Sequence, residues 1–188
     1  MKEWDFIVNE QNKNRGFSLI EILVTIAVLA IVSVASMSIY SWIKSHRFKS
    51  MVENVNDAIS DTRSRTTTKE GSYELVISKN ASDGNFIAEL YQNRGASNER
   101  IVEKYTISKK GSIWCGDKAN NGATTYKVED GNNICIAFSK LDGSITKMVM
   151  ETAGGNIVLD KGIINFNYDG LTRKIKMIEL TGKHYIEK

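Results

Sequence analysis

The chain has 188 residues, of which 41% are apolar and 25% charged, so it can bury the core of one modest domain and is not a disordered tail. Its 25 basic and 22 acidic side chains give a formal net charge of +3, a balance too even to indicate a polyanion-binding protein from the total alone. There is no proline, and most of the 14 glycines lie after residue 66 among Asn, Asp and Ser, which predicts tight turns between short strands there.

The first strong feature along the chain is an apolar segment. Between Phe17 and Ile43 the only charged residue is Glu21, and residues 22–43 contain neither a charge nor a helix breaker. Such a run is long enough to cross a bilayer as a helix. Its apolar part is longer than that of a secretory signal, and no small-x-small cleavage pattern follows it, so we expect the helix to stay with the mature protein.

The carboxylate of Glu21 needs an explanation, because a charge in hydrocarbon costs a few kcal/mol. One interpretation is that Glu21, one turn into the helix, only reaches back to the lipid headgroups. In the other, cleavage between Gly16 and Phe17 makes Glu21 the fifth residue of a new chain, close to a free amino group on its own or a neighbouring subunit. In a low dielectric this pair would offset the burial of both charges and fix the axial register of packed helices.

The residues from Lys13 to Glu21, KNRGFSLIE, resemble the class III signal of type IV pilins and of the pseudopilins of type II secretion systems. In that family a membrane aspartyl peptidase removes the leader after the glycine and methylates the new N-terminal phenylalanine. The resemblance therefore implies cleavage between Gly16 and Phe17, N-methylation of Phe17, and Glu21 as the assembly carboxylate. Many major pilins carry a proline at mature position 22, where this chain has Ser38, which favours a minor pilin or pseudopilin.

Basic residues flank both ends of the apolar segment. Two precede it closely and three follow it, namely Lys13 and Arg15, then Lys44, Arg47 and Lys49. A count of positive charges alone would place the residues after the segment in the cytoplasm, whereas the resemblance requires the leader there. We follow the leader motif, because it accounts for the glycine, the phenylalanine and the glutamate together.

Beyond the apolar segment, apolar residues recur at spacings of three and four up to Ile59, opposite a polar face. This pattern predicts one continuous helix from Phe17 to about Arg65, whose second half packs on a globular head. The predicted organisation is a leader at 1–16, a transmembrane and filament-core helix at 17–43, the amphipathic half of the same helix at 44–65, and a β-rich head at 66–188.

The head contains short alternating or β-branched runs separated by Asp-Gly and Gly-Gly pairs, which suit hairpins. The predicted strands are 72–78, 85–92, 100–108, 124–128, 133–140, 144–150, 163–168 and 174–180. The predicted fold class is therefore α+β, and the resemblance implies the type IV pilin fold, with the long helix packed on an antiparallel sheet. Residues 57–65 and 71–77, with 163–170 and 181–183, are also similar to FimT-like and H-type minor pseudopilins.

The sequence contains no nucleophile elbow, phosphate-binding loop, dinucleotide motif or cluster of metal ligands, so we predict no enzyme, no cofactor and no metal site. The two cysteines, Cys115 and Cys135, lack both CxxC spacing and a nearby histidine. If the head lies outside the cytoplasm, we expect them to form one disulfide that closes a loop of about 20 residues and contributes roughly 3 kcal/mol.

The C-terminal 28 residues, 161–188, suggest a different function. They contain six basic and three acidic residues, together with several aromatic side chains. Phosphate contact and base stacking could use such a surface. The candidate nucleic-acid contacts are Arg173, Lys174, Lys176 and Lys183. We favour the alternative that these lysines solubilise an edge strand and discourage aggregation.

These observations predict a prepilin, a minor pilin or pseudopilin of a type IV pilus or a type II secretion-like filament. It would sit in the inner membrane as a single-pass protein before assembly and then in an extracellular or periplasmic filament. The resemblance implies three partners: other pilin subunits, the prepilin peptidase and the inner-membrane assembly platform. Two alternatives stay open, a DNA-capturing minor pilin and an uncleaved, membrane-anchored binding domain.

Overall fold

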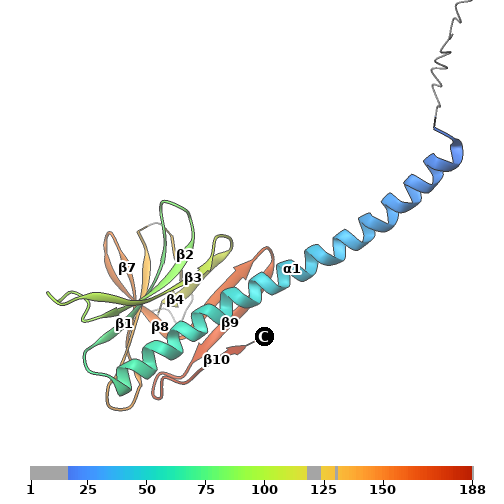
Figure 1. Cartoon of the computed structure of the whole chain (residues 1–188). Helices are drawn as coiled ribbons and strands as arrows, with labels where there is room; N and C mark the ends of the chain where they lie inside the picture. Colours follow the sequence, from blue (N-terminus) through green and yellow to red (C-terminus); the bar gives the residue numbers. More distant parts are fainter. Residues whose placement is uncertain (1–16, 118–123, 130, 188) are drawn as a thin grey trace, which may run out of the picture. The chain divides into compact units, whose positions relative to one another are not determined.

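Figure 1 shows the computed structural model of the chain, which describes residues 17–117, 124–129 and 131–187. The chain divides into two compact units, Met1–Trp42 and Ile43–Lys188, and we call the second the head unit. One helix, α1 (Leu19–Thr68), contributes residues to both units. The remaining elements are strands, so the structure has the predicted α+β class, with a long N-terminal helix and a large antiparallel sheet.

Helix α1 forms because its sequence contains no proline or glycine and its head-unit part has one apolar face. That face is completely covered and comprises Phe48, Met51, Val52, Val55, Ala58 and Ile59. Towards the C-terminus the side chains of Thr62 and Thr66 return hydroxyl hydrogen bonds to the carbonyls four residues earlier. Gly71, with φ of +98°, then reverses the chain into the first strand.

Ten strands follow α1 in the head unit. They are β1 (Tyr73–Lys79), β2 (Phe86–Gln92), β3 (Arg100–Ser108), β4 (Ser112–Asp117), β5 (Thr125–Lys127), β6 (Asn133–Phe138), β7 (Ile145–Thr152), β8 (Gly155–Tyr168), β9 (Leu171–Met177) and β10 (His184–Glu187). The order across the sheet is β10-β9-β8-β7-β6-β1-β2-β3, and β4 pairs with both β8 and β5. All pairings are antiparallel, as the short connections require.

The long strand β8 joins the two halves of this sheet. Its first residues, 155–158, pair with β7, whereas residues 163–168 pair with β9 and 159–167 pair with β4. A two-residue turn connects β8 to β9, and both of its residues, Asp169 and Gly170, have positive φ, as a type I′ hairpin demands.

The core lies between the covered face of α1 and one face of the sheet (Figure 1). Phe166 of β8 is the largest side chain with no exposed surface. Polar contacts fix the helix at the rim of this core: the amide of Asn54 donates to the carbonyl of Thr106 at 2.9 Å, and the hydroxyl of Tyr105 donates to Asp61 at 3.0 Å.

The observed helix and strands differ from those predicted from the sequence mainly in strands that the prediction lacked. Helix α1 ends at Thr68 rather than near Arg65, which is within the usual uncertainty of a helix end. Strands β4 and β10 were not predicted, and β8 begins at Gly155 rather than at residue 163.

Candidate functional site

The start of α1 carries a reciprocal capping arrangement. The backbone N–H of Ser18 donates to the Glu21 carboxylate at 2.8 Å, and the backbone N–H of Glu21 donates to the Ser18 hydroxyl at 3.2 Å. This is the capping box of a Ser-x-x-Glu sequence, which satisfies two of the backbone donors that a helix leaves open at its N-terminus. The carboxylate also faces the positive end of the helix dipole. Glu21 therefore fixes where the helix begins.

Sequence reasoning singled out Glu21 for its charge and missed this local role, although the Ser18-x-x-Glu21 spacing signals it. The cap holds the carboxylate at the backbone N–H of Ser18, the residue that follows Phe17. The side chain of Phe17 is 83% exposed. An amino group created at Phe17 would lie one residue away from the N–H that Glu21 binds. Gly16, the other half of the predicted cleavage pair, lies outside the described residues.

The helix surface that follows is apolar and uncovered. Within the described part of the chain, α1 is long and apolar enough to cross a membrane, and none of that apolar window is buried. Its exposed side chains include Leu19, Ile20, Leu23, Ile26, Leu29, Ile31 and Val34. Such an uncovered apolar surface fits surroundings of lipid or of other helices.

The structure does not bring the two predicted disulfide partners together. Both cysteines are buried free thiols. Cys115 on β4 belongs to the core and pairs in register with Ile164 of β8, whereas Cys135 on β6 lies outside the core cluster. The two strands are not neighbours, because β4 pairs with β5 and β8 while β6 pairs with β1 and β7. The structure therefore shows two separate thiols and no disulfide between them.

The thiol of Cys135 instead lies within a charge network on the outer face of the sheet. Arg94 donates to Glu151 at 2.8 and 2.7 Å, to Glu74 at 3.1 Å and to the Cys135 sulfur at 3.2 Å. Lys147 bonds Glu74 at 2.7 Å. The hydrogen bond from Arg94 lowers the pKa of Glu151, and burial raises the pKa of the Cys135 thiol to about 12.

This network resembles a metal site only in its donor atoms. Atoms of Glu74, Cys135 and Glu151 lie within 4.8 Å of one another, which is close enough for three ligands of one ion. The guanidinium of Arg94, however, bonds all three and already supplies the positive charge between them. The arrangement is an internal ion-pair network that ties the β2–β3 connection to β1, β6 and β7.

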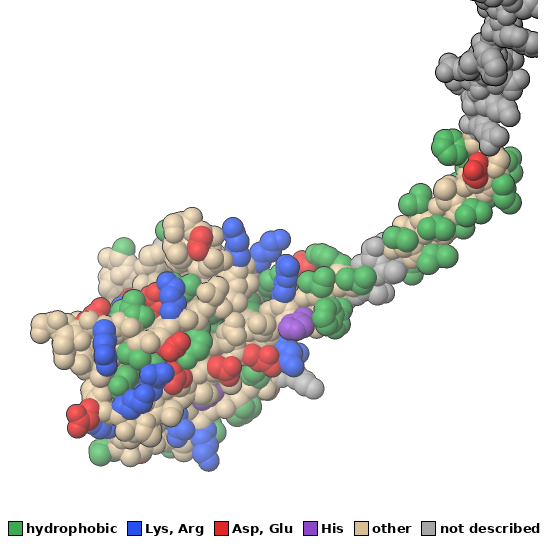
Figure 2. Space-filling view, in the orientation of Figure 1, with side chains coloured by type: hydrophobic (Ala, Val, Ile, Leu, Met, Phe, Trp, Pro, Cys, Tyr) green, Lys and Arg blue, Asp and Glu red, His purple; other side chains and the backbone are tan. Residues whose placement is uncertain are grey.

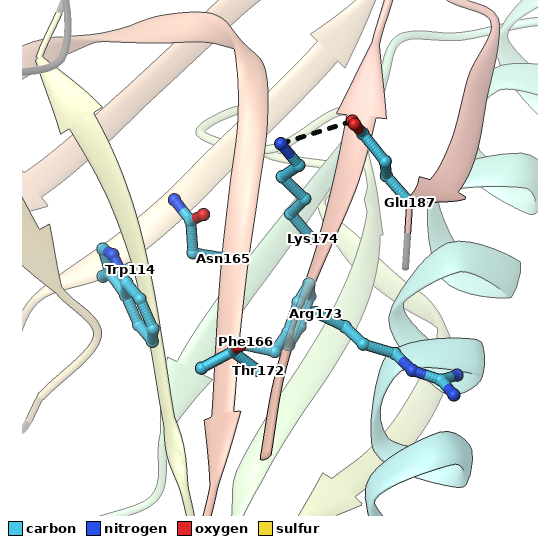
Figure 3. Close-up of a pocket in the computed structure, with 7 residues that line it drawn as sticks. All are labelled: Trp114, Asn165, Phe166, Thr172, Arg173, Lys174 and Glu187. Carbon is cyan, nitrogen blue, oxygen red and sulfur yellow. Dashed lines mark ion pairs between the residues drawn. The ribbon is translucent and has the colours of Figure 1, made fainter. Parts of the chain in front are cut away.

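The four basic residues considered for nucleic-acid contact differ in their surroundings. Arg173 points towards α1, where its guanidinium carbon lies 5.8 Å from the centre of the Phe48 ring (Figure 3). Lys174 pairs with Glu187 at 3.4 Å beside a shallow pocket of about 150 Å³. Lys176 and Lys183 are exposed. Two of the four side chains are therefore already engaged within the head unit.

The comparisons with known proteins concern the start of the chain. Residues 11–37 match the family model of the prokaryotic N-terminal methylation motif. No curated protein and no solved structure matches the chain significantly. The match covers the predicted cleavage pair, the capping box and most of the apolar segment, up to residue 37.

The long N-terminal helix and the large antiparallel sheet form an α+β layout that is consistent with the type IV pilin fold, and the matched motif lies at the start of that helix. The motif at residues 11–37 is that of the class III signal of type IV pilins, and it supports a type IV pilin-like or pseudopilin subunit. The motif implies processing by a prepilin peptidase and assembly with other pilins, and with the apolar helix it fits membrane anchoring before assembly.

Proposed function

We propose that the protein is a minor pilin or pseudopilin, cleaved between Gly16 and Phe17, methylated on Phe17 and inserted into a filament through α1. The observation that supports this most is the methylation-motif match at residues 11–37, directly over the capped helix start. The minor role is supported by Ser38 at the position where many major pilins have proline, since a straighter helix suits pseudopilins. The head unit would then decorate the filament surface or its tip.

Glu21 has two successive tasks in this proposal. In the precursor its carboxylate is held by the N–H of Ser18 and helps the helix to begin. After cleavage a positive amino group stands at Phe17, one residue away, or on a neighbouring subunit. In the filament core, where the dielectric is low, the pair of charges attracts strongly and each removes the burial penalty of the other. Subunits in the wrong axial register would leave both charges unpaired.

The experiment separates the charge of Glu21 from its capping. Glutamine also completes a capping box, so Glu21→Gln keeps the helix start while removing the negative charge. Ser18→Ala does the reverse, because it removes the capping hydroxyl and leaves the carboxylate. Each variant is expressed in the native cell, and its processing and its amount in sheared filaments are measured.

We expect Glu21→Gln and Glu21→Ala to be cleaved normally but to be depleted at least tenfold from filaments, whereas Ser18→Ala enters them. Gly16→Leu should block cleavage altogether. If Glu21→Gln assembled like the wild type, the charge-pairing role would be wrong. A chain that keeps its leader in the native cell and tolerates all four changes would be the membrane-anchored binding domain instead.

Nucleic-acid capture depends on Lys176 and Lys183, since Arg173 contacts Phe48 and Lys174 pairs with Glu187. We expect the full chain to retain little DNA at low salt and the double change of Lys176 and Lys183 to Glu to leave that retention unchanged. A large loss of retention in this variant, with the fold intact, would favour DNA capture.

A further inference from the structure

An open groove of about 450 Å³ lies at the end of the head unit where α1 enters it. Three elements line it: the start of the head-unit part of α1, the β3–β4 turn and the end of β8. The lining residues are His46, Arg47, Ser50, Ile107, Ser108, Lys109, Lys110 and Tyr168. Figure 2 shows Lys and Arg side chains and a His at this end of the head unit, with Asp or Glu side chains beside them. We call His46, Arg47, Lys109 and Lys110 the base cluster.

The turn that carries two of these residues is firmly held. The Ser108 hydroxyl donates to the carbonyl of Lys110 at 2.8 Å and accepts from its N–H at 3.2 Å. The next residue, Gly111, has φ of +106°, and a Cβ there would stand 2.5 Å from the carbonyl oxygen of Asn167. The backbone of the turn therefore packs directly on β8, which fixes the position of both lysines beside α1.

Three members of the base cluster, Arg47, Lys109 and Lys110, carry positive charge. Arg47, Lys109 and Lys110 are exposed, and among the described residues none of the three forms an ion pair. The acidic groups nearby are Asp169, which pairs with Lys44 at 2.9 Å, and Asp83, whose charge acts on Lys109. The groove therefore presents an excess of positive charge, which suits a phosphate.

The cluster follows the apolar segment directly along the chain. Arg47 lies four residues after Ile43, which is about 6 Å of helix rise. Just before that point Tyr40 and Trp42 are each 67% exposed, and these two residue types are enriched at the headgroup level of membranes. A membrane-spanning segment that ends near Trp42 leaves only four residues of chain, 43–46, before Arg47, which keeps Arg47 within reach of the phosphates.

We propose that the base cluster binds the phosphates of anionic phospholipids on the membrane face where the head unit emerges, and so seats the head unit on the bilayer before assembly. This inference rests on the membrane-anchored stage of the proposed function. It also accounts for the basic residues after the apolar segment, which a charge count alone would place in the cytoplasm. Each Lys or Arg near an anionic surface favours the bound state about fivefold, so the cluster is strong enough to orient a head that the helix already tethers.

The test uses the full chain reconstituted into two kinds of vesicle, phosphatidylcholine alone and equal parts of phosphatidylcholine and phosphatidylglycerol. Flotation first shows that the chain is inserted. A membrane-impermeant amine reagent then labels exposed lysines, and peptide mass spectrometry measures the labelling rate at Lys109 and Lys110. Lys140, an exposed residue of the β6–β7 turn, is the internal reference.

We expect labelling at Lys109 and Lys110 to be at least about fivefold slower in the anionic vesicles, to recover in high salt, and to be unchanged at Lys140. Arg47→Glu should abolish most of this protection, whereas Lys140→Glu should leave it intact. Equal labelling in both kinds of vesicle, in a chain that floats, would overturn this inference alone. Protection that arises only when other pilin subunits are added would assign the groove to an acidic protein partner and overturn it too. A chain that does not float would remove the membrane-anchored stage and this inference with it.

Discussion

Replacing Arg94 with alanine should destabilise the head unit by about 2–3 kcal/mol, more than an exposed ion pair contributes. Arg94 bonds Glu151 through two nitrogens and also contacts Glu74 and Cys135. The side chains of Arg94, Glu74 and Glu151 are only 24%, 16% and 25% exposed, so water would solvate the stranded carboxylates incompletely.

The magnitude follows from the charges that remain. Without Arg94, carboxylate oxygens of Glu74 and Glu151 stand within 4.8 Å of one another. At an effective dielectric constant of about 20 their repulsion is about 3.5 kcal/mol. Lys147, which stays 2.7 Å from Glu74 and 3.8 Å from Glu151, offsets part of it. Arg94→Lys keeps a charge but not the two-nitrogen contact, so it should cost only about 1 kcal/mol.

The assay is chemical denaturation of the full chain in detergent, followed by the far-ultraviolet signal of the sheet. Adding Glu151→Gln to Arg94→Ala removes the repulsion and should recover about half of the lost stability, which a double-mutant cycle measures. In a thermal scan the single variant should melt roughly 5–10 °C below the wild type. A loss below about 0.5 kcal/mol would refute the network as a source of stability.

The same pair predicts a pH dependence. Arg94 lowers the pKa of Glu151 in the folded chain below its ordinary value of 4.5. This contribution is complete above the unfolded pKa and is lost as pH falls through the folded pKa, because the carboxylate then takes up a proton. In Arg94→Ala the repulsion between Glu74 and Glu151 raises the pKa of the pair instead, so the stability gap between the wild type and this variant should be widest near neutral pH and narrow steadily as the pH falls into the acid range. A gap that stays unchanged at low pH would contradict the assignment to Glu151.

Three further predictions concern the core, a turn and the thiols. Phe166→Ala should cost about 3–5 kcal/mol of unfolding free energy and Phe166→Leu clearly less, since the site is fully buried; equal losses would contradict tight packing there. Gly111→Ala should cost more than Gly95→Ala, because both have positive φ but only at Gly111 does the new Cβ meet a backbone carbonyl. Cys115 and Cys135 should react with a thiol reagent only after unfolding, and a reductant should leave the melting temperature unchanged; a reductant-sensitive transition would show that they are bonded.

The helix and most of the strands could be predicted because their signals are local. The apolar run and the three- and four-residue spacing identify α1, and Asp-Gly pairs mark several hairpins. Strand β4 was missed because its sequence, SIWCGD, contains few β-forming residues and lies between turn-forming segments. Its alternation emerges only in the structure, where Ile113, Cys115 and Asp117 are buried and Trp114 is half-buried.

The site residues were predictable to the extent that their roles depend on sequence neighbours. Ser18 and Glu21 could have been recognised as a capping box from spacing alone. Arg173 and Lys174 are adjacent on a strand and must point to opposite faces, so the period of two argued against a single basic surface. The separation of Cys115 from Cys135 could not be predicted, since it depends on which strands pair and which face of the sheet packs on the helix.

The central claim, that this chain is processed and assembled through its N-terminal helix, is tested most directly by mass spectrometry of filaments sheared from the native cell. We expect an N-terminal peptide that begins with methylated Phe17, present in trace amounts relative to the most abundant pilin. A dominant amount would make the protein a major pilin. Absence from filaments, with the leader still attached in the membrane fraction, would contradict both cleavage and assembly.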